Sequence, residues 1–125
     1  MSIEIISATH NGLDGMLVNV EVDINKGMPS FSIVGLPDAS VKESKERVRS
    51  AIVNSGYEFP LGRITINLAP ADIRKIGSLL DLPIAIGILM KSNQITNKDL
   101  KDFIIFGQLY LHNLNKNQSF YFPLH

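Results

Sequence analysis

Apolar and polar residues alternate in several stretches of the chain, and this alternation predicts β-strands. The clearest run is Leu17–Ile24, in which Val18, Val20, Val22 and Ile24 fall on one side and Asn19, Glu21 and Asp23 on the other. That pattern is typical of a half-buried strand with one face in water. Further strands are predicted at Ser30–Val34, at Arg63–Leu68 and near the N-terminus, where Ile3, Ile5 and Ile6 precede a stop at His10–Gly12.

A helical spacing of apolar and small residues begins at Val41 and predicts a first helix. The residues that share this stripe are Val41, Ser44, Val48, Ala51, Ile52 and Ser55. Asp38 and Ser40 are candidate N-caps, and Ser40 with Glu43 fits a capping box. Glu43 and Arg47 are predicted to pair across one turn. Asn54–Gly56 marks the end of the helix.

A second helix is predicted at Leu82–Asn93, with Asp81 as its N-cap. This segment is apolar on nearly every side, which predicts a buried helix. A short helix at Asn97–Asp102 and a strand at Phe103–Leu111 complete the order. We therefore expect an α+β fold in which a mixed, mostly meandering sheet carries two main helices on one face. The turn residues Asn25–Gly27 would join two neighbouring strands.

Composition narrows the class of protein. The chain has 125 residues, the size of one domain, with 45% hydrophobic residues. Lysine plus arginine and aspartate plus glutamate both number 12, so no global charge attracts the chain to nucleic acid. The absence of cysteine excludes disulfides and thiolate zinc sites. No signal peptide or membrane span is evident, because the longest apolar run, Leu82–Met90, is far below the ~20 residues that a span needs. We expect a cytoplasmic protein.

Several separated motifs resemble the ComM or magnesium-chelatase-like AAA+ family. They are Phe31–Asp38, Val41–Ala51, Asn54–Pro60, Arg63–Asp72 and Asp81–Leu89, in that order. The resemblance implies a Lon-protease-like N-terminal domain in the ribosomal protein S5 domain 2-like group. It also implies that full-length members continue into an AAA+ motor, and that ComM acts as a hexameric ring in natural competence and branch migration of DNA.

The resemblance sets the expected domain boundaries. Residues 1–112 correspond to the Lon-like domain, and the AAA+ motor domain is absent from this chain. Two stretches depart from the family pattern: Arg74–Gly77 replaces Pro-Lys-Glu-Gly, and family members continue differently after Leu111. Residues 113–125 lack periodicity, so we expect an irregular C-terminal tail, as in a truncated or frameshifted product or a fragment.

The sequence offers no site for ATP or a metal. A P-loop requires a Gly-Lys dipeptide before Ser or Thr, and no Gly-Lys dipeptide occurs here. His10, His112 and His125 are scattered, without the spacing of metal ligands. ATP and magnesium are therefore expected only in the absent motor, and this chain is expected to need no cofactor.

Ser78 is a weak candidate nucleophile. The resemblance places it near the nucleophile loop of Lon-like peptidases, where a lysine activates a serine. The partner lysine should follow residue 111, where only Lys116 stands. Alternatively, Ser78 only shapes the loop before the second helix. Asp72 is interpreted as a structural partner of Arg74 or Lys75.

Lys42, Lys45 and Arg49 form a basic stripe on the first helix and are weak candidates for nucleic-acid contact. Glu43 and Glu46 interrupt the stripe, and no aromatic residue stands among these positions in the sequence. The favoured hypothesis is a non-catalytic accessory domain that partners an AAA+ motor, with a homo-oligomer and DNA as further partners. The alternatives are a vestigial or conditional Ser-Lys peptidase and a stand-alone DNA-binding module.

Overall fold

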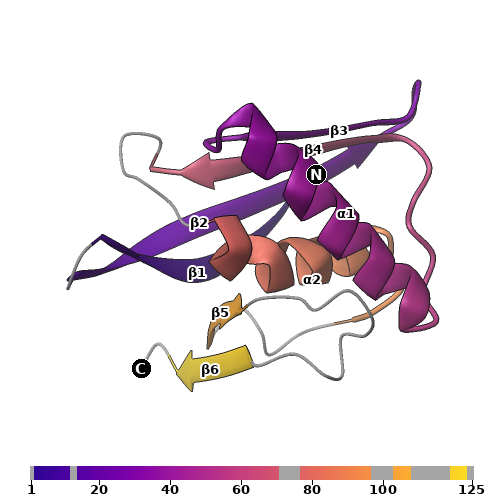
Figure 1. Cartoon of the computed structure of the whole chain (residues 1–125). Helices are drawn as coiled ribbons and strands as arrows, with labels where there is room; N and C mark the ends of the chain where they lie inside the picture. Colours follow the sequence, from indigo (N-terminus) through magenta and orange to yellow (C-terminus); the bar gives the residue numbers. More distant parts are fainter. Residues whose placement is uncertain (1, 12–13, 71–76, 97–102, 108–118, 124–125) are drawn as a thin grey trace.

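The computed structural model describes residues 2–11, 14–70, 77–96, 103–107 and 119–123, and the side chains within 2–8, 15–70 and 79–96. Four strands form one mixed sheet in the order β1-β2-β4-β3 (Figure 1). Their bounds are β1 Ile3–Asn11, β2 Asp14–Asn25, β3 Ser30–Val34 and β4 Arg63–Ala69. A second, two-stranded sheet pairs β5 (Phe103–Gly107) with β6 (Ser119–Pro123). The expected α+β class is confirmed.

The sheet is mixed, as expected, but its strands do not follow one another as a meander. The strands β2 and β3 do not pair with each other, because β4 lies between them, antiparallel to β2 and parallel to β3. The physical reason lies in the side chains that face the core: β4 buries Ile64, Ile66 and Leu68 almost completely, whereas β3 buries only Ile33 to that extent and Phe31 partly. The more apolar strand takes the central position, and β3 becomes an edge strand.

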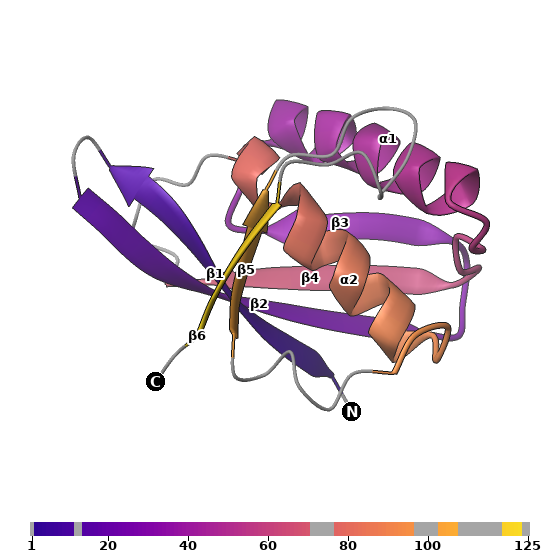
Figure 2. The same ribbon diagram turned by 90° about the horizontal axis from the view of Figure 1, so that it is seen from below.

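Two helices cover one face of the four-stranded sheet (Figure 2). Helix α1 spans Asp38–Asn54, and α2 spans Asp81–Lys91 directly after the short 3-10 helix η1, Gly77–Leu80. Helix α2 contacts β1 and β2, while α1 contacts α2 and β3. No helix in the described part of the chain is long and apolar enough to cross a membrane.

The buried core lies between this helical layer and the sheet. The predicted inward residues of β2 include Val18, Val20 and Val22, which are completely buried. Helix α2 is buried along most of its length, as expected, and only Ile86 and Met90 among its apolar side chains are partly exposed. The opposite face of the sheet is polar, and there the Asn67 side chain donates a hydrogen bond to Glu21 at 3.4 Å.

Gly87 brings α2 unusually close to the sheet. A Cβ atom at this position would lie 2.6 Å from Cγ2 of Val22 and 3.4 Å from Cδ1 of Ile5. Two carbon atoms at the shorter of these distances repel each other strongly, because their favourable separation is ~3.5–4.0 Å. The absence of a side chain at Gly87 therefore fixes the spacing between α2 and the centre of the sheet.

The first helix starts earlier than its apolar stripe suggests. Pro37 occupies the N-cap position of α1, and no side chain caps it. The proposed caps at Asp38 and Ser40, and the capping box, are therefore wrong, since Ser40 and Glu43 both lie inside the helix. Proline presets the extended backbone that an N-cap position requires, so the helix begins at Asp38 without a side-chain acceptor.

The C-terminal part differs from the sequence expectation. Residues 113–125 were expected to be irregular, yet Ser119–Pro123 forms β6 and pairs with β5 in antiparallel register. The consecutive aromatic residues Phe120–Phe122 are of a type enriched in strands, but they show no alternation that would predict one. The short helix expected at Asn97–Asp102 lies outside the described residues, and the S5-like grouping stays an expectation.

Candidate functional site

The candidate site is an open groove at one end of the molecule, beside the edge strand β3. Its lining comes from three segments: the start of β3, the outer side of α1 and the loop between α1 and β4. The residues that line it are Pro29, Ser30, Phe31, Lys45, Arg49, Phe59, Pro60, Leu61 and Gly62. A shallower extension past Arg49 is lined by Val53, Tyr57 and Glu58. We call the whole the edge groove.

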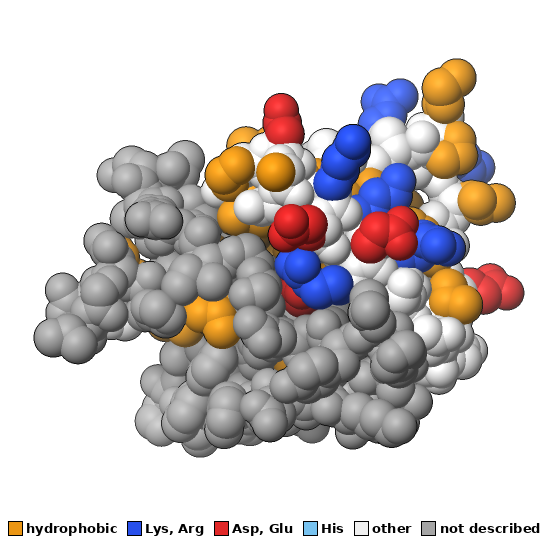
Figure 3. Space-filling view, in the orientation of Figure 1, with side chains coloured by type: hydrophobic (Ala, Val, Ile, Leu, Met, Phe, Trp, Pro, Cys, Tyr) orange, Lys and Arg blue, Asp and Glu red, His pale blue; other side chains and the backbone are white. Residues whose placement is uncertain are grey.

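The edge groove combines apolar side chains with positive charge. The rings of Phe31 and Phe59 are tilted against each other with centroids 6.3 Å apart. Leu61 is 89% exposed and adds an apolar side chain to the surface of the groove. Lys45 and Arg49 both contribute to the lining and are exposed. Figure 3 shows basic and apolar side chains gathered on this part of the surface.

The loop that carries Phe59 and Leu61 is held at both ends. The Gln94 side chain accepts a hydrogen bond from the Glu58 backbone N–H and donates one to the Glu58 carbonyl oxygen, both at 2.7 Å. At the other end, the backbone N–H of Ser30 donates to the Gly62 carbonyl oxygen at 3.1 Å. Gly62 has φ +138°, and a Cβ there would lie 2.8 Å from the Asn25 carbonyl oxygen. The loop therefore presents its side chains on a defined backbone.

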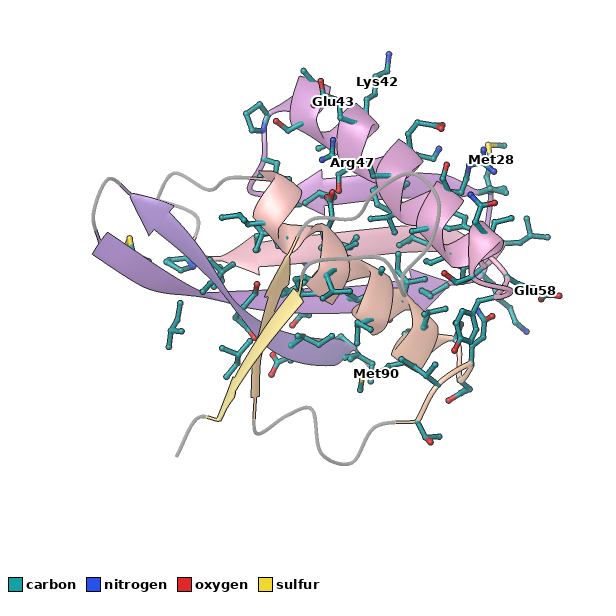
Figure 4. The ribbon with its side chains drawn as sticks, turned by 60° about the horizontal axis from the view of Figure 1, so that its bottom comes forward. Met28, Lys42, Glu43, Arg47, Glu58 and Met90 are labelled. Carbon is teal, nitrogen blue, oxygen red and sulfur yellow. The ribbon has the colours of Figure 1, made fainter. Side chains whose placement is uncertain are left out.

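The three basic candidates on α1 do not share one environment. Lys45 and Arg49 line the edge groove, whereas Lys42 is not among its lining residues and extends away from the molecule (Figure 4). Glu43 and Glu46 are exposed on the same helix. The fold also brings Phe31 and Phe59 beside Lys45 and Arg49, although no aromatic residue stands near them in the sequence of the helix.

A buried carboxylate joins the two helices. Asp81 is fully buried, and its Oδ1 accepts hydrogen bonds from the Ser44 hydroxyl at 2.9 Å and from Arg47 Nη2 at 3.3 Å. Its Oδ2 accepts a hydrogen bond from Arg47 Nε. Arg47 reaches Glu43 as well, at 3.8 Å, so the predicted pair across one turn is confirmed. The hydrogen bond to Asp81 raises the pKa of Arg47 above its ordinary value, against the opposing effect of burial.

The interpretation of Asp81 as a helix N-cap was therefore wrong in detail. Leu80 occupies the N-cap position of α2, and Asp81 is the first residue of the helix. Its carboxylate still sits where the helix dipole favours a negative charge. It accepts hydrogen bonds from Ser44 and Arg47 of α1. Sequence reasoning missed this contact because Ser44 and Asp81 are 37 positions apart.

Ser78 falls within η1, but its side chain lies outside the described part of the structure, as do Asp72, Arg74, Lys75 and Lys116. The Ser-Lys hypothesis therefore stays a prediction. The side chains of His10, His112 and His125 also lie outside that part. Among the residues whose placement is described, no three His, Cys, Asp or Glu side chains cluster as metal ligands would.

A direct chemical test addresses Ser78. We expect a fluorophosphonate probe to leave the protein unlabelled, because a serine hydroxyl without a desolvated lysine is a weak nucleophile. Intact-mass spectrometry after incubation would check this, with Ser78→Ala as the matched control. An added mass in the natural chain that disappears in the variant would favour the peptidase hypothesis.

Comparisons with known proteins identify one matching family and several relatives. The family described as subunit ChlI of Mg-chelatase matches residues 20–121. An uncharacterized protein of Escherichia coli K12, YifB, is 52% identical over 100 residues, which is 80% of this chain and 20% of that protein. The competence protein ComM of Haemophilus influenzae is 47% identical over 112 residues, 89% of this chain and 22% of the relative. The chain thus spans about a fifth of the length of these relatives.

Proposed function

This chain belongs to the family of subunit ChlI of Mg-chelatase, and we propose that it is a non-catalytic accessory domain that assists a hexameric AAA+ motor in DNA processing. The observation that carries the proposal is the extent of the family match, residues 20–121, in a chain without a P-loop sequence. The name of one relative, the competence protein ComM, supports DNA processing as the setting.

The geometry supports an accessory role. The core between the sheet and the helices is filled by side chains such as Val20, Ile66 and Ile84, all completely buried. The surface beside β3, in contrast, leaves apolar groups such as Leu61 and Val53 exposed around a groove. An exposed apolar surface on a rigid scaffold favours contact with another polypeptide. Cytoplasmic location and a homo-oligomeric state belong to the same proposal.

A domain exchange in a relative tests the proposal. We would delete the matched region from the Haemophilus influenzae relative and, separately, replace it with residues 1–112 of this chain. ATP hydrolysis of the deleted form should stay within about threefold of the full protein, because the P-loop chemistry resides elsewhere. ATP-driven strand exchange on branched DNA should fall at least about tenfold on deletion and return in the exchanged form. A tenfold loss of ATP hydrolysis on deletion, or undiminished strand exchange, would contradict the accessory role.

A simpler measurement tests whether this chain binds a nucleotide. The purified chain should show no rise in melting temperature with millimolar Mg-ATP, because a ligand that binds the native state stabilises it by mass action. Differential scanning fluorimetry with and without Mg-ATP checks this, and Mg-ADP serves as a second nucleotide. A shift of several degrees that saturates with ATP concentration would count against the proposal.

The peptidase and the stand-alone DNA-binding module remain alternatives from the sequence. Lys42, Lys45 and Arg49 stay candidate contacts to phosphates, and salt-dependent binding to duplex DNA would test them. Of the four basic side chains on α1, Arg47 is paired with the buried Asp81, and two glutamates stand among the others. The described surface of that helix therefore favours an accessory domain over a DNA-binding module.

A further inference from the structure

The edge groove adjoins the start of a strand whose outer edge is open in the described structure. The strand β3 pairs with β4 on one side, and no described strand lies beyond it on the other. An edge strand presents a row of backbone N–H and C=O groups that can pair with another extended chain. Peptides that add to such an edge obtain affinity from the backbone and specificity from pockets for alternate side chains.

The side chains around the groove define what such a peptide would carry. Added beside β3, alternate residues of the peptide would face the helical layer. Phe31 and Phe59 offer an apolar surface there, extended by the exposed Leu61. Lys45 and Arg49 are four residues apart on α1, so they lie on one side of that helix, both lining the groove. One helix-facing position of the peptide therefore suits an apolar side chain, and the next suits a carboxylate.

From this arrangement we propose that the edge groove binds an extended acidic peptide segment, which adds as a strand to β3. Its helix-facing positions carry an apolar side chain over Phe31 and Phe59 and a carboxylate beside Lys45 and Arg49. The inference goes beyond the accessory role, because it names the chemistry of the partner and rests on the groove alone. It holds whatever motor the chain accompanies.

Nucleic acid fits the same surface less well. A polynucleotide needs a row of cations along its phosphates, and the edge groove has two, with Glu58 in its extension. Lys42, which would lengthen the row, is not part of the lining. The rings of Phe31 and Phe59 pack against each other, and the aliphatic groups of Pro29, Pro60 and Leu61 around them match peptide side chains.

The test uses the whole chain and a synthetic octapeptide with blocked ends. Leucine and glutamate alternate at its even positions, threonine fills the odd positions, and a fluorescein label reports binding by anisotropy. We expect a Kd on the order of 100 µM, because a short flexible peptide loses conformational freedom on binding. Amide chemical shifts in the ¹⁵N-labelled protein should change at Ser30–Val34. A peptide with lysine in place of glutamate should bind at least about tenfold more weakly.

Two pairs of variants isolate charge and apolar contact. Lys45→Glu with Arg49→Glu should weaken binding at least about tenfold, while Lys42→Glu on the same helix should change it less than about twofold. Leu61→Ser should weaken binding about fivefold. Met28→Ser is the matched control, because Met28 is 84% exposed but does not line the groove. Circular dichroism would verify that each variant is folded. We expect all of them to fold, because substitutions of exposed residues rarely prevent folding.

Backbone pairing has its own test. Successive N–H groups of a strand point to opposite sides, so only one alternate set in the peptide can face β3. N-methylation of one set should abolish binding, and N-methylation of the other should preserve it. Equal tolerance of both sets would overturn strand addition, and so would no binding at millimolar peptide. A thymidine oligonucleotide that binds through Lys45 and Arg49 while the peptide does not would replace the proposal with nucleic-acid recognition.

These outcomes are separate from those of the domain exchange. The peptide assay needs no motor and no ATP, so it can fail while the exchanged relative still works, and the reverse also holds.

Discussion

Replacing Asp81 with alanine is expected to lower the free energy of unfolding by about 3 kcal/mol, because it leaves the Arg47 guanidinium without its buried partner. Asp81 is 0% exposed and Arg47 is 25% exposed at its side chain, so water can compensate only part of the lost contact. The Ser44 hydroxyl would also lose its acceptor in the interior. Urea unfolding followed by circular dichroism measures the change.

The matched control is Glu43→Ala, which removes the other carboxylate of the same arginine. Glu43 is 72% exposed and 3.8 Å from Arg47, so its loss should cost no more than about 0.5 kcal/mol. If Asp81→Ala were as mild as Glu43→Ala, the contact between the two helices would not be an important source of stability.

The pH dependence of this ion pair follows from the direction of the Arg47 shift. The pKa of Arg47 is raised above its ordinary value, mainly by the hydrogen bond to Asp81. A raised pKa of a basic group contributes stability below the unfolded pKa, and that stability is lost as pH rises through the folded pKa. The arginine contribution should therefore be constant from about pH 6 to about pH 9.

Replacing Gly87 with alanine is expected to cost about 2 kcal/mol, although alanine is the better helix former by about 1 kcal/mol. The new methyl group would lie 2.6 Å from Cγ2 of Val22, on a strand that has little room to retreat. Gly15→Ala is the control, because nothing described lies within 4 Å of a Cβ at that position.

Adding Val22→Ala to Gly87→Ala provides the decisive comparison. Val22→Ala removes the atom that the new methyl group meets, so the two changes together should destabilise the protein less than their sum by about 1 kcal/mol. Strict additivity in urea unfolding would show that the close contact between α2 and β2 does not account for the glycine.

The strand and helix positions could be predicted because each rests on a local pattern. Val18, Val20 and Val22 alternate with polar residues, and Val48, Ala51 and Ile52 follow a helical spacing, so both faces were correctly assigned to the core. The order of strands could not be obtained in the same way. The insertion of β4 between β2 and β3 depends on which strand buries more apolar surface, a competition between segments far apart in the sequence.

The candidate site was harder to foresee for a related reason. Lys45 and Arg49 were identified from their helix, but their aromatic neighbours come from β3 and from the loop after α1. The run Tyr57–Leu61 did carry a usable indication, because apolar residues alternate there outside any predicted strand. Exposure of Leu61, and the backbone clamp by Gln94, follow only from tertiary contacts.

That clamp has a consequence for protein engineering. Gln94, which follows the end of α2, binds the backbone of Glu58 through its side chain. The loop on one side of the edge groove is therefore held by a residue 36 positions away in the sequence. A minimal fragment that contained only Pro29–Arg63 would carry every lining side chain and yet lack this brace. The recognition surface is in this sense a discontinuous epitope. To move this surface to another scaffold, one would have to transfer the strand–helix–strand unit and provide a substitute for Gln94 in the new scaffold.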